Sequence, residues 1–322
     1  MKAEASAPGK VILVGEHFVV ENQPAIAVAL DLRAKVLVEV LEGEPKIEIT
    51  SKNLVISEVF TLTSVNKESP LYPIYYAAKT TMDFIGKEKP LRIIIDSEIP
   101  PAAGMGSSGS VAVATVAATS SALGVSLGKE DISRLAYQAE VIVHGKPSGI
   151  DNTIATYGAA IAYRKTEGFV ELKADFSPVL LVLADSGIPR STGEMVRRVR
   201  ALKERYPKIM NPLYHAAGHL AIEAGKAIEA GDFERLGELM NINHGMLSAV
   251  GVSNLVLEKL VYVARKSGAL GAKITGAGGG GFIVALCWRE DAEKVAESLR
   301  NLSNRVIVGQ ISQEGVRVES SL

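Results

Sequence analysis

A glycine-rich loop at residues 104–109 constrains the fold of this chain more than any other feature. The run Gly104-Met105-Gly106-Ser107-Ser108-Gly109 fits the Gly-x-Gly-x-x-Gly pattern, follows a predicted strand at Arg92–Asp96 and opens a predicted helix. Glycines let backbone N–H groups approach phosphate oxygens, and the start of a helix offers unpaired N–H donors and a positive dipole end. The loop therefore predicts a cradle for a polyphosphate.

A dinucleotide-binding fold is the first alternative that this loop raises, and the downstream sequence argues against it. That fold needs an acidic residue about 20 positions after the loop, at the end of a second parallel strand. Glu130 and Asp131 instead open a predicted helix. The loop is not a Walker A motif either, because no Gly-Lys pair in the chain is followed by Ser or Thr, and the protein-kinase signature set is missing. We therefore expect a phosphate cradle on a different scaffold.

Two further features of the glycine-rich segments bear on ligand binding. Ser107 and Ser108 stand at the helix start, where one can cap the helix and the other can reach a phosphate-bound Mg²⁺; two N-caps in a tight turn are the alternative. A second cluster, Gly276–Gly281, leads into a strand instead of a helix. Its consecutive glycines cost conformational entropy, which suggests close backbone approach to a ligand or to the first domain, with a flexible hinge as the alternative.

The bulk composition restricts the partners. With 322 residues, 47% of them hydrophobic and 22% charged, the chain suits a folded protein of two domains. A net charge of -1 provides no field that would attract nucleic acid or an anionic membrane, so a small molecule is the expected partner. Cys287, the only cysteine, excludes an internal disulfide, fits a reducing compartment and is expected to be a buried hydrophobic residue.

The apolar stretches do not have the pattern of export signals or membrane spans. Met1–Gly15 has no charged region followed by an apolar core and is predicted to form a strand. Val111–Val125 contains several hydroxyl side chains and is shorter than the ~20 residues of a membrane-spanning helix. We therefore expect a buried helix at this stretch and a cytoplasmic location for the protein.

The order of predicted elements indicates an α+β fold. Short runs of branched residues predict a strand-rich first part, with helices at Val111–Leu123 and Lys129–Val143. The second part has long amphipathic helices between residues 191 and 267, followed by a strand, a helix and a strand. We place the boundary near Asp175–Pro178, which predicts an N-terminal domain at 1–177 and a C-terminal domain at 178–322.

Polar clusters in otherwise apolar sequence carry a family resemblance. The segments Pro8–His17, Pro100–Ser110 and Lys273–Gly281 occur in the order and approximate spacing of the three motifs of the GHMP kinase superfamily, which the chain resembles from Ala7 to about Phe282. The run His144–Asn152 is similar to the mevalonate kinase version of the segment between the second and third motifs. Ala102-Ala103 and Gly109-Ser110 depart from the family pattern by small-for-small changes. These departures bear on fine nucleotide contacts more than on the class.

The resemblance implies a fold and an activity. The fold is two α+β domains with the active site in the cleft between them, and the activity is transfer of the γ-phosphoryl of ATP to the C5 hydroxyl of mevalonate, giving 5-phosphomevalonate for isoprenoid biosynthesis. ATP would lie along the second motif. The residues implied in binding it are Pro101, Ala102, Ala103, Gly104, Met105, Gly106, Ser107, Ser108 and Gly109.

The resemblance also assigns the reacting groups. Asp151 is the implied base facing the substrate hydroxyl, with Lys10 beside it. An aspartate with an ordinary pKa near ~3.9 is a weak base toward an alcohol, so an ammonium that stabilises the forming alkoxide is a sensible complement. Ser108 and Glu140 would hold Mg²⁺ against the β- and γ-phosphates. An ordinary surface acid is the alternative for Glu140.

The substrate side involves residues from three segments. The resemblance places Glu16 and His17, and also Gly149 and Asp151, toward the acceptor. Arg190 and Thr192 match a family position near the mevalonate carboxylate, which a guanidinium can grip through two hydrogen bonds. An arginine that neutralises a surface acid is the alternative.

One histidine pair has the spacing of metal ligands. His215 and His219 lie four residues apart on a predicted helix, but no catalytic acid stands between them, so the sequence argues against a zinc site. His244 is expected on a helix surface or as a packing partner.

Other functions in the superfamily remain as alternatives. Galactokinases typically carry arginine in place of Lys10 and homoserine kinases lack an equivalent of Asp151, which disfavours both. Phosphomevalonate kinase or another alcohol kinase is nearer, although the former lacks a convincing counterpart to 144–151. Diphosphomevalonate decarboxylase differs in its loop sequence. Retention of Ser108 and Glu140 together with Lys10 and Asp151 argues against a non-catalytic binding protein. The sequence leaves homodimer formation open.

Overall fold

The chain forms two compact units. The computed structural model describes residues 1–61, 64–100, 103–145, 147–189 and 191–321, and of residues 143, 144 and 321 it describes the backbone alone. Unit 1 consists of Met1–Lys10, Leu32–Gly158 and Gln313–Leu322, and unit 2 consists of Val11–Asp31 and Ala159–Ser312. The units thus interleave along the chain, because the strands β1 (Lys2–Val14) and β2 (Ala25–Val40) each continue from one into the other. The linear domain boundary at residue 177 stays a prediction.

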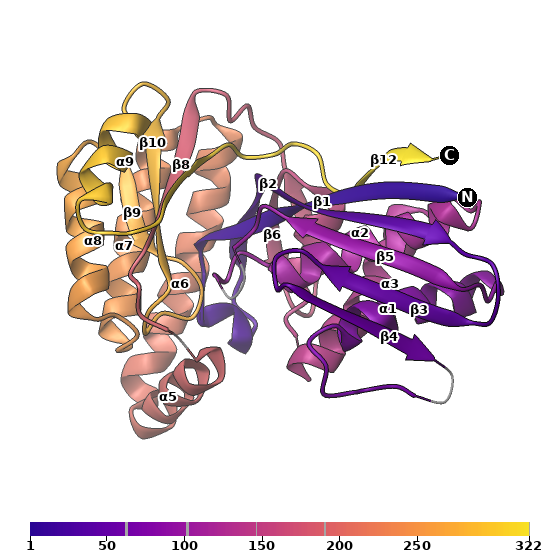
Figure 1. Cartoon of the computed structure of the whole chain (residues 1–322). Helices are drawn as coiled ribbons and strands as arrows, with labels where there is room; N and C mark the ends of the chain where they lie inside the picture. The colour runs from indigo at the N-terminus through magenta and orange to yellow at the C-terminus, as the bar shows by residue number, and fades with distance from the viewer. Residues whose placement is uncertain (62–63, 101–102, 146, 190, 322) are drawn as a thin grey trace. The chain divides into compact units, whose positions relative to one another are not determined.

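Unit 1 is a sheet with helices on one face (Figure 1). Its strands follow the order β12-β1-β2-β5-β3-β4, with β3 parallel to β5 and antiparallel to β4. Apart from β1 and β2, its elements are β3 (Lys46–Ser51), β4 (Ile56–Thr61), α1 (Tyr72–Ile85), β5 (Leu91–Ser97), α2 (Ser107–Ala122), α3 (Lys129–His144), α4 (Ile150–Tyr157) and β12 (Arg317–Ser321).

Helix α2 is the centre of unit 1. It contacts α1, α3 and α4 and is buried along almost its whole length. A helix surrounded on all sides needs small or apolar residues all round, and α2 consists of Ala, Val, Gly, Ser and Thr together. The prediction of a buried helix in this stretch is confirmed. The helix starts at Ser107, earlier than the predicted Val111, so the glycine-rich loop runs directly into its first turn.

Unit 2 contains a four-stranded antiparallel sheet in the order β11-β8-β10-β9, together with a β6–β7 hairpin that pairs with Ala25–Val28 of β2. Its elements are the 3-10 helix η1 (Phe18–Glu21), β6 (Ala160–Arg164), β7 (Gly168–Leu172), β8 (Val179–Asp185), α5 (Thr192–Arg205), α6 (Pro207–Glu229), α7 (Phe233–Ala249), α8 (Leu255–Lys266), β9 (Gly271–Ile274), β10 (Phe282–Trp288), α9 (Ala292–Arg300) and β11 (Val306–Gly309). The α+β class predicted from the sequence is confirmed.

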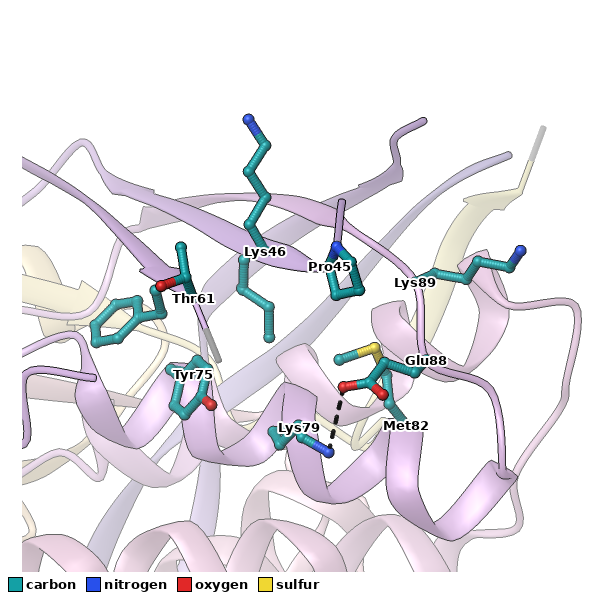
Figure 2. A pocket seen from close by; sticks show the side chains of 10 residues that line it. Pro45, Lys46, Thr61, Tyr75, Lys79, Met82, Glu88 and Lys89 are labelled. Carbon is teal, nitrogen blue, oxygen red and sulfur yellow. Dashed lines mark ion pairs between the residues drawn. The ribbon is translucent and has the colours of Figure 1, made fainter. Parts of the chain in front are cut away.

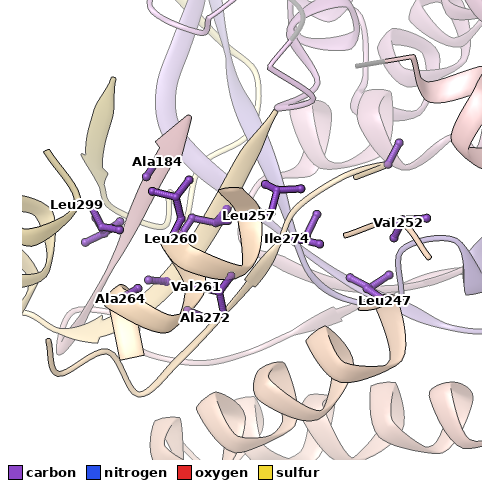
Figure 3. Packing of buried hydrophobic residues seen from close by; sticks show 14 of the residues in the cluster. Ala184, Leu247, Val252, Leu257, Leu260, Val261, Ala264, Ala272, Ile274 and Leu299 are labelled. Carbon is purple, nitrogen blue, oxygen red and sulfur yellow. The ribbon is translucent and has the colours of Figure 1, made fainter. Parts of the chain in front are cut away.

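The core of unit 2 lies where α8 packs on the sheet (Figure 3). Residues at helical spacing, namely Leu257, Leu260, Val261 and Ala264, form one apolar stripe that is buried against β9 and β10. Cys287 of β10 belongs to the same cluster, and burial raises the pKa of its thiol to about 12, which confirms the prediction of an inert buried cysteine. Within the described parts of the chain, no helix combines the length and apolarity that crossing a bilayer requires.

Candidate active site

The glycine-rich loop of unit 1 is shaped by two charged side chains. Gly104 and Gly106 have left-handed φ values of 74° and 69°, and Gly106 occupies the N-cap position of α2. A Cβ on Gly106 would lie 2.8 Å from Cγ of Lys10, and one on Gly109 would lie 3.0 Å from Cβ of Asp151. The glycines therefore do more than admit a phosphate, because they allow Lys10 and Asp151 to reach the first turn of α2.

Lys10 and Asp151 form an ion pair at the start of α2. The Nζ of Lys10 lies 2.9 Å from Oδ1 of Asp151, and the two side chains are 9% and 27% exposed. The backbone N–H of Lys10 donates to the carbonyl of Met105 at 2.8 Å, which joins β1 to the loop. Asp151 lies in the first turn of α4, two residues after the N-cap Gly149, whose φ is 86°, and the positive end of the helix favours a carboxylate there. Both partners are thus positioned by backbone geometry.

A second polar pair lies beside the first. The hydroxyl of Ser108, in the first turn of α2, donates to the carboxylate of Glu140 on α3. Glu140 is only 2% exposed, and burial is the main reason why its pKa rises to about 7. The negative charge of Asp151 raises this pKa further, while the bond from Ser108 and the charge of Lys10 lower it. Asp151, Ser108 and Lys10 therefore all act on the carboxyl group of Glu140 within unit 1.

The capping expected of the serines is not what the structure shows. We predicted that one of Ser107 and Ser108 would cap the helix, but the N-cap position falls on Gly106 and no side chain caps there. The hydroxyl of Ser108 is instead directed to Glu140, so Ser108 and Glu140 are the pair that the metal prediction requires. A hydroxyl and a carboxylate are hard oxygen donors, and they fit Mg²⁺, which takes few protein ligands and keeps several waters.

The turn after β1 forms a separate polar cluster in unit 2. Glu16 makes an ion pair with Lys273 of β9, and the two are 2% and 0% exposed. Asn243 of α7 donates from Nδ2 to the carboxylate of Glu16 at 3.3 Å and accepts the N–H of Gly15 at 3.2 Å. Every charged atom of this pair is thus held by partners, which is the condition under which a buried ion pair is tolerated.

His17 is held in a conformation that few residues adopt. Its φ is 61°, in the left-handed region, and its Nε2 lies 2.8 Å from the carbonyl oxygen of Ala277 in the second glycine cluster. A carbonyl can only accept, so Nε2 carries the proton. Burial lowers the pKa of this imidazole, which keeps the ring neutral at pH 7.

Comparisons with known proteins bear on this arrangement. Residues 73–159 match the model of the GHMP kinases N terminal domain, and residues 225–304 match the GHMP kinases C terminal model. The chain is 40% identical over 333 residues to a mevalonate kinase of Thermococcus sibiricus, with 99% of each chain covered. The chain belongs to the mevalonate kinase family of the GHMP superfamily.

Two further relatives support the family assignment over the full length. A mevalonate kinase of Aeropyrum pernix is 40% identical over 320 residues, with 98% of each chain covered. The crystal structure of L. major mevalonate kinase in complex with R-mevalonate is 30% identical, has a TM-score of 0.82, and covers 95% of this chain and 94% of that one. The resemblance and the GHMP kinase fold predicted from the sequence are therefore confirmed.

One of the two departures from the GHMP pattern, Gly109-Ser110, now has a structural reason. A Cβ at Gly109 would also lie 3.1 Å from the backbone carbon of Asp151, so the alanine that is usual in the family would crowd α4. Ser110 lies with its Oγ 2.7 Å from the carbonyl oxygen of Pro8, which ties α2 to the segment before Lys10. These contacts were missed in the sequence, although the departures themselves marked the positions.

The second glycine cluster supports a neighbouring loop. A Cβ on Gly278 would lie 2.4 Å from the carbonyl oxygen of Val252, and one on Gly280 would lie 2.3 Å from that of Ile188. Gly281 donates its N–H to the same Ile188 carbonyl at 3.0 Å. The cluster therefore packs tightly within unit 2 and is not a loose hinge. It holds the segment that leads toward residues 190–192.

The remaining predicted site residues divide into placed and undescribed ones. Ala103 and Met105 lie in the loop before α2, and Thr192 opens α5 behind the N-cap residue Ser191. Pro101, Ala102, Lys146 and Arg190 lie outside the described residues, and so does the side chain of His144. Their roles and the interdomain location of the site stay predictions.

The sequence analysis assigned no role to Lys273 or Asn243. Lys273 lies within the third motif, where it is the only charged residue of the buried strand β9. A lone charge in such a strand is the signal that would have identified it, because a buried charge needs a partner. Asn243 gave no comparable signal on its amphipathic helix.

A shallow pocket elsewhere in unit 1 contains none of the predicted residues (Figure 2). It has about 260 Å³ of open space, a figure that includes solvent at its mouth. Lys79 at its rim lies 3.7 Å from Glu88, and Lys46 is paired with Glu48 at 2.7 Å. Two of the three lysines that line the pocket, Lys46 and Lys79, are thus engaged by neighbouring acids, and the pocket contains none of the groups at α2.

The raised pKa of Glu140 predicts a pH-dependent stability. A carboxyl group whose pKa is 4.5 when unfolded and about 7 when folded stabilises the native state below pH 4.5, and this contribution is lost as the pH rises through 7. The loss amounts to about 3 kcal/mol in the free protein. In the wild type, the free energy of unfolding measured by urea titration should therefore decrease between pH 5 and 8. In Glu140→Gln this decrease should be absent. Glu130→Gln, at the exposed start of α3, is the control, and equal pH slopes in all three proteins would contradict the prediction.

Breaking the buried pair in unit 2 should cost more than removing it. Lys273→Met leaves the carboxylate of Glu16 buried without its cation, so we expect a loss of about 3–5 kcal/mol in the free energy of unfolding. Adding Glu16→Gln should restore part of this loss, because the uncompensated charge is gone. Lys266→Met, on the exposed end of α8, serves as the control in the same urea titrations. A double variant less stable than Lys273→Met alone would overturn the assignment of a compensated pair.

Proposed function

We propose that this protein transfers the γ-phosphoryl group of ATP to the C5 hydroxyl of mevalonate, giving 5-phosphomevalonate. The observation that carries the proposal is the Lys10–Asp151 ion pair, 2.9 Å long, at the N-terminus of α2. Its relatives at 40% identity are named mevalonate kinases, and a structural relative binds R-mevalonate. A base, a cation and an anion-binding helix start are the parts that phosphoryl transfer to an alcohol requires.

The proposed mechanism assigns one task to each member of the pair. Asp151 is partly exposed and accepts the proton of the substrate hydroxyl as the oxygen attacks the γ-phosphorus. Lys10 is less exposed, and its ammonium stabilises the negative charge that develops on this oxygen. The bond between the γ-phosphorus and the bridging oxygen breaks, and ADP leaves with that oxygen. The backbone N–H groups of the loop from Gly104 to Ser108 bind the phosphates against the positive end of α2.

Ser108 and Glu140 would hold Mg²⁺ in this mechanism. The metal supplies charge neutralisation to the phosphate oxygens when it is bound. Glu140 has a pKa of about 7 in the free protein, so its carboxyl group is partly protonated there at neutral pH. The negative charge that Asp151 places nearby contributes to this state. A cation at this position therefore completes the charge balance that the free protein achieves with a proton.

The acceptor specificity rests on the other predicted residues. Arg190 and Thr192 would bind the mevalonate carboxylate, and Glu16 and His17 would border the acceptor. Glu16 is fully engaged with Lys273 and Asn243 in unit 2, so in this proposal it mainly fixes the turn that presents His17. We also propose a cytoplasmic location, to which the single buried thiol is suited.

A coupled ADP-release assay tests the proposal. Purified wild-type protein and the Asp151→Asn variant are each assayed with Mg²⁺-ATP and one of five acceptors: mevalonate, phosphomevalonate, diphosphomevalonate, homoserine or galactose. We expect turnover of mevalonate alone, with kcat reduced by a factor of ~10² or more in the variant, because an amide cannot accept the proton. The KM for ATP should change little, since Asp151 acts on the acceptor.

A matched acid separates the role of Asp151 from a general charge effect. Asp131 is an exposed aspartate at the start of α3, paired with Arg134, and Asp131→Asn should keep full activity. Phosphorylation of another acceptor would replace the substrate in this proposal and keep the phosphoryl-transfer site. Release of phosphate and carbon dioxide from diphosphomevalonate would instead indicate the decarboxylase, and full activity in Asp151→Asn would remove the proposed base.

A further inference from the structure

Two histidines on the outer surface of α6 face each other across one helical turn. His215 and His219 are both exposed, and their Nε2 atoms lie 3.1 Å apart. The rings meet edge to face with centroids 4.6 Å apart. Because residues four apart lie on the same face of a helix, the backbone itself holds the two nitrogens together. The pair takes no part in the proposed phosphoryl transfer.

The spacing of the two nitrogens is that of a chelate. Two Zn–N bonds of about 2.0–2.1 Å at a tetrahedral angle place the nitrogen atoms roughly 3.3 Å apart. The observed 3.1 Å is a hydrogen bond between the two rings, which a metal replaces. Rotation about the side-chain bonds turns both lone pairs toward the ion and supplies the few tenths of an ångström in spacing. Imidazole nitrogens favour Zn²⁺, Ni²⁺, Co²⁺ and Cu²⁺, whereas Mg²⁺ favours oxygen. The pair is therefore chemically distinct from Ser108 and Glu140.

The surroundings supply no third protein ligand, because the nearest acid is already paired with two cations. Glu223 lies one turn beyond His219, and the two groups interact electrostatically. Its two carboxylate oxygens accept from Lys226 at 2.8 Å and from Arg235. Among the residues that the structure describes, no group of three or more His, Cys, Asp and Glu side chains is arranged to hold a metal. Water must therefore complete the coordination of any ion bound by the pair.

We propose that His215 and His219 form a surface site for one divalent transition-metal ion, with two imidazole ligands and water in the remaining positions. The absence of an acid between the histidines, which argued against zinc in the sequence, excludes a hydrolytic centre. The absence of an acid does not argue against a site that only binds a metal ion and stabilises the helix. Each Nε2 provides one lone pair to the ion, and any ring proton on that nitrogen is released to water.

The site braces the part of α6 that supports the turn after β1. On the buried face of the same helical segment, Tyr214 packs edge to face on Phe18 with ring centroids 5.0 Å apart. A Cβ on Gly218 would lie 2.2 Å from Oε1 of Gln23, so the helix backbone approaches this turn closely. A metal that bridges 215 and 219 fixes the outer side of that segment. Its expected effect is greater stability of the fold, with no chemical step.

Thermal unfolding of chelator-treated full-length protein tests the site. We expect a molar excess of Zn²⁺ or Co²⁺ to raise Tm by about 2–4 °C, while Mg²⁺ at the same concentration does not reproduce the rise. His215→Gln keeps a polar side chain and a good helix former but removes one imidazole. It should lose the Tm rise and weaken Zn²⁺ binding at least ~10-fold in competition with a chromophoric chelator. Glu229→Gln, an exposed acid at the end of α6, should retain both.

A second readout identifies the ligands directly. The electron paramagnetic resonance spectrum of Cu²⁺ added in one equivalent should show two nitrogen ligands in the wild type and one in His219→Gln. Binding of unchanged strength in both histidine variants would place the metal elsewhere and overturn the proposal. A Tm that does not respond to Zn²⁺ in the wild type would overturn the bracing role. None of these measurements depends on kinase activity, so failure here is separable from failure of the proposed function.

Discussion

The ion pair between Lys10 and Asp151 is the interaction on which the local structure of the site depends. It joins the strand β1 to the first turn of α4, and both partners press against the start of α2. The space for them exists only because Gly106 and Gly109 have no side chains. A pair of charges with little exposure must gain enough from mutual attraction and fixed hydrogen bonds to offset the loss of hydration. Here the hydrogen bond from the backbone N–H of Lys10 to the carbonyl of Met105 helps to hold Lys10 in place.

The charges around this pair form a balanced group. Asp151 and Glu140 repel each other when both are ionised. Burial and this repulsion together raise the pKa of Glu140 to about 7. Lys10 and the hydroxyl of Ser108 partly relieve it. Such an arrangement is costly for a protein that only needs to fold, and strongly shifted pKa values are typical of functional sites. The site thus has the electrostatic character expected of one that receives a cation and a polyphosphate.

The sequence predicted those parts of the fold that depend on local pattern. The strand-rich first part of the chain, the strand near residues 92–96 and the long helices of unit 2 follow from the pattern of apolar residues, and the structure has them. The helix α1, with its aromatic residues, and the eight-residue helix α4 were not anticipated, because neither has a long apolar repeat. The glycine-rich loop was predicted from the spacing of its glycines and the strand before it, and the helix after it from the apolar run at 111–125.

The features that the sequence did not predict depend on contacts between distant segments. The hydroxyl of Ser108 bonds to Glu140 instead of capping α2, because the N-cap position falls on Gly106 and α3 lies within reach. The pairing of Lys273 with Glu16 joins residues 257 positions apart, and nothing near either one in sequence indicates the other. The roles of Lys10, Asp151, Ser108 and Glu140 came from family resemblance, and their proximity in unit 1 is the physical support for those roles.

A double-mutant cycle on the phosphoryl-transfer step tests the central claim, that Lys10 and Asp151 act as one unit. Single-turnover rate constants with saturating Mg²⁺-ATP and mevalonate would be measured for the wild type, Lys10→Met, Asp151→Asn and the double variant. Residues in direct contact show coupling energies of about 0.5–3 kcal/mol, so the double variant should be little slower than the slower single variant. Losses that simply multiply in the double variant would show that the two residues act independently, which would contradict the account.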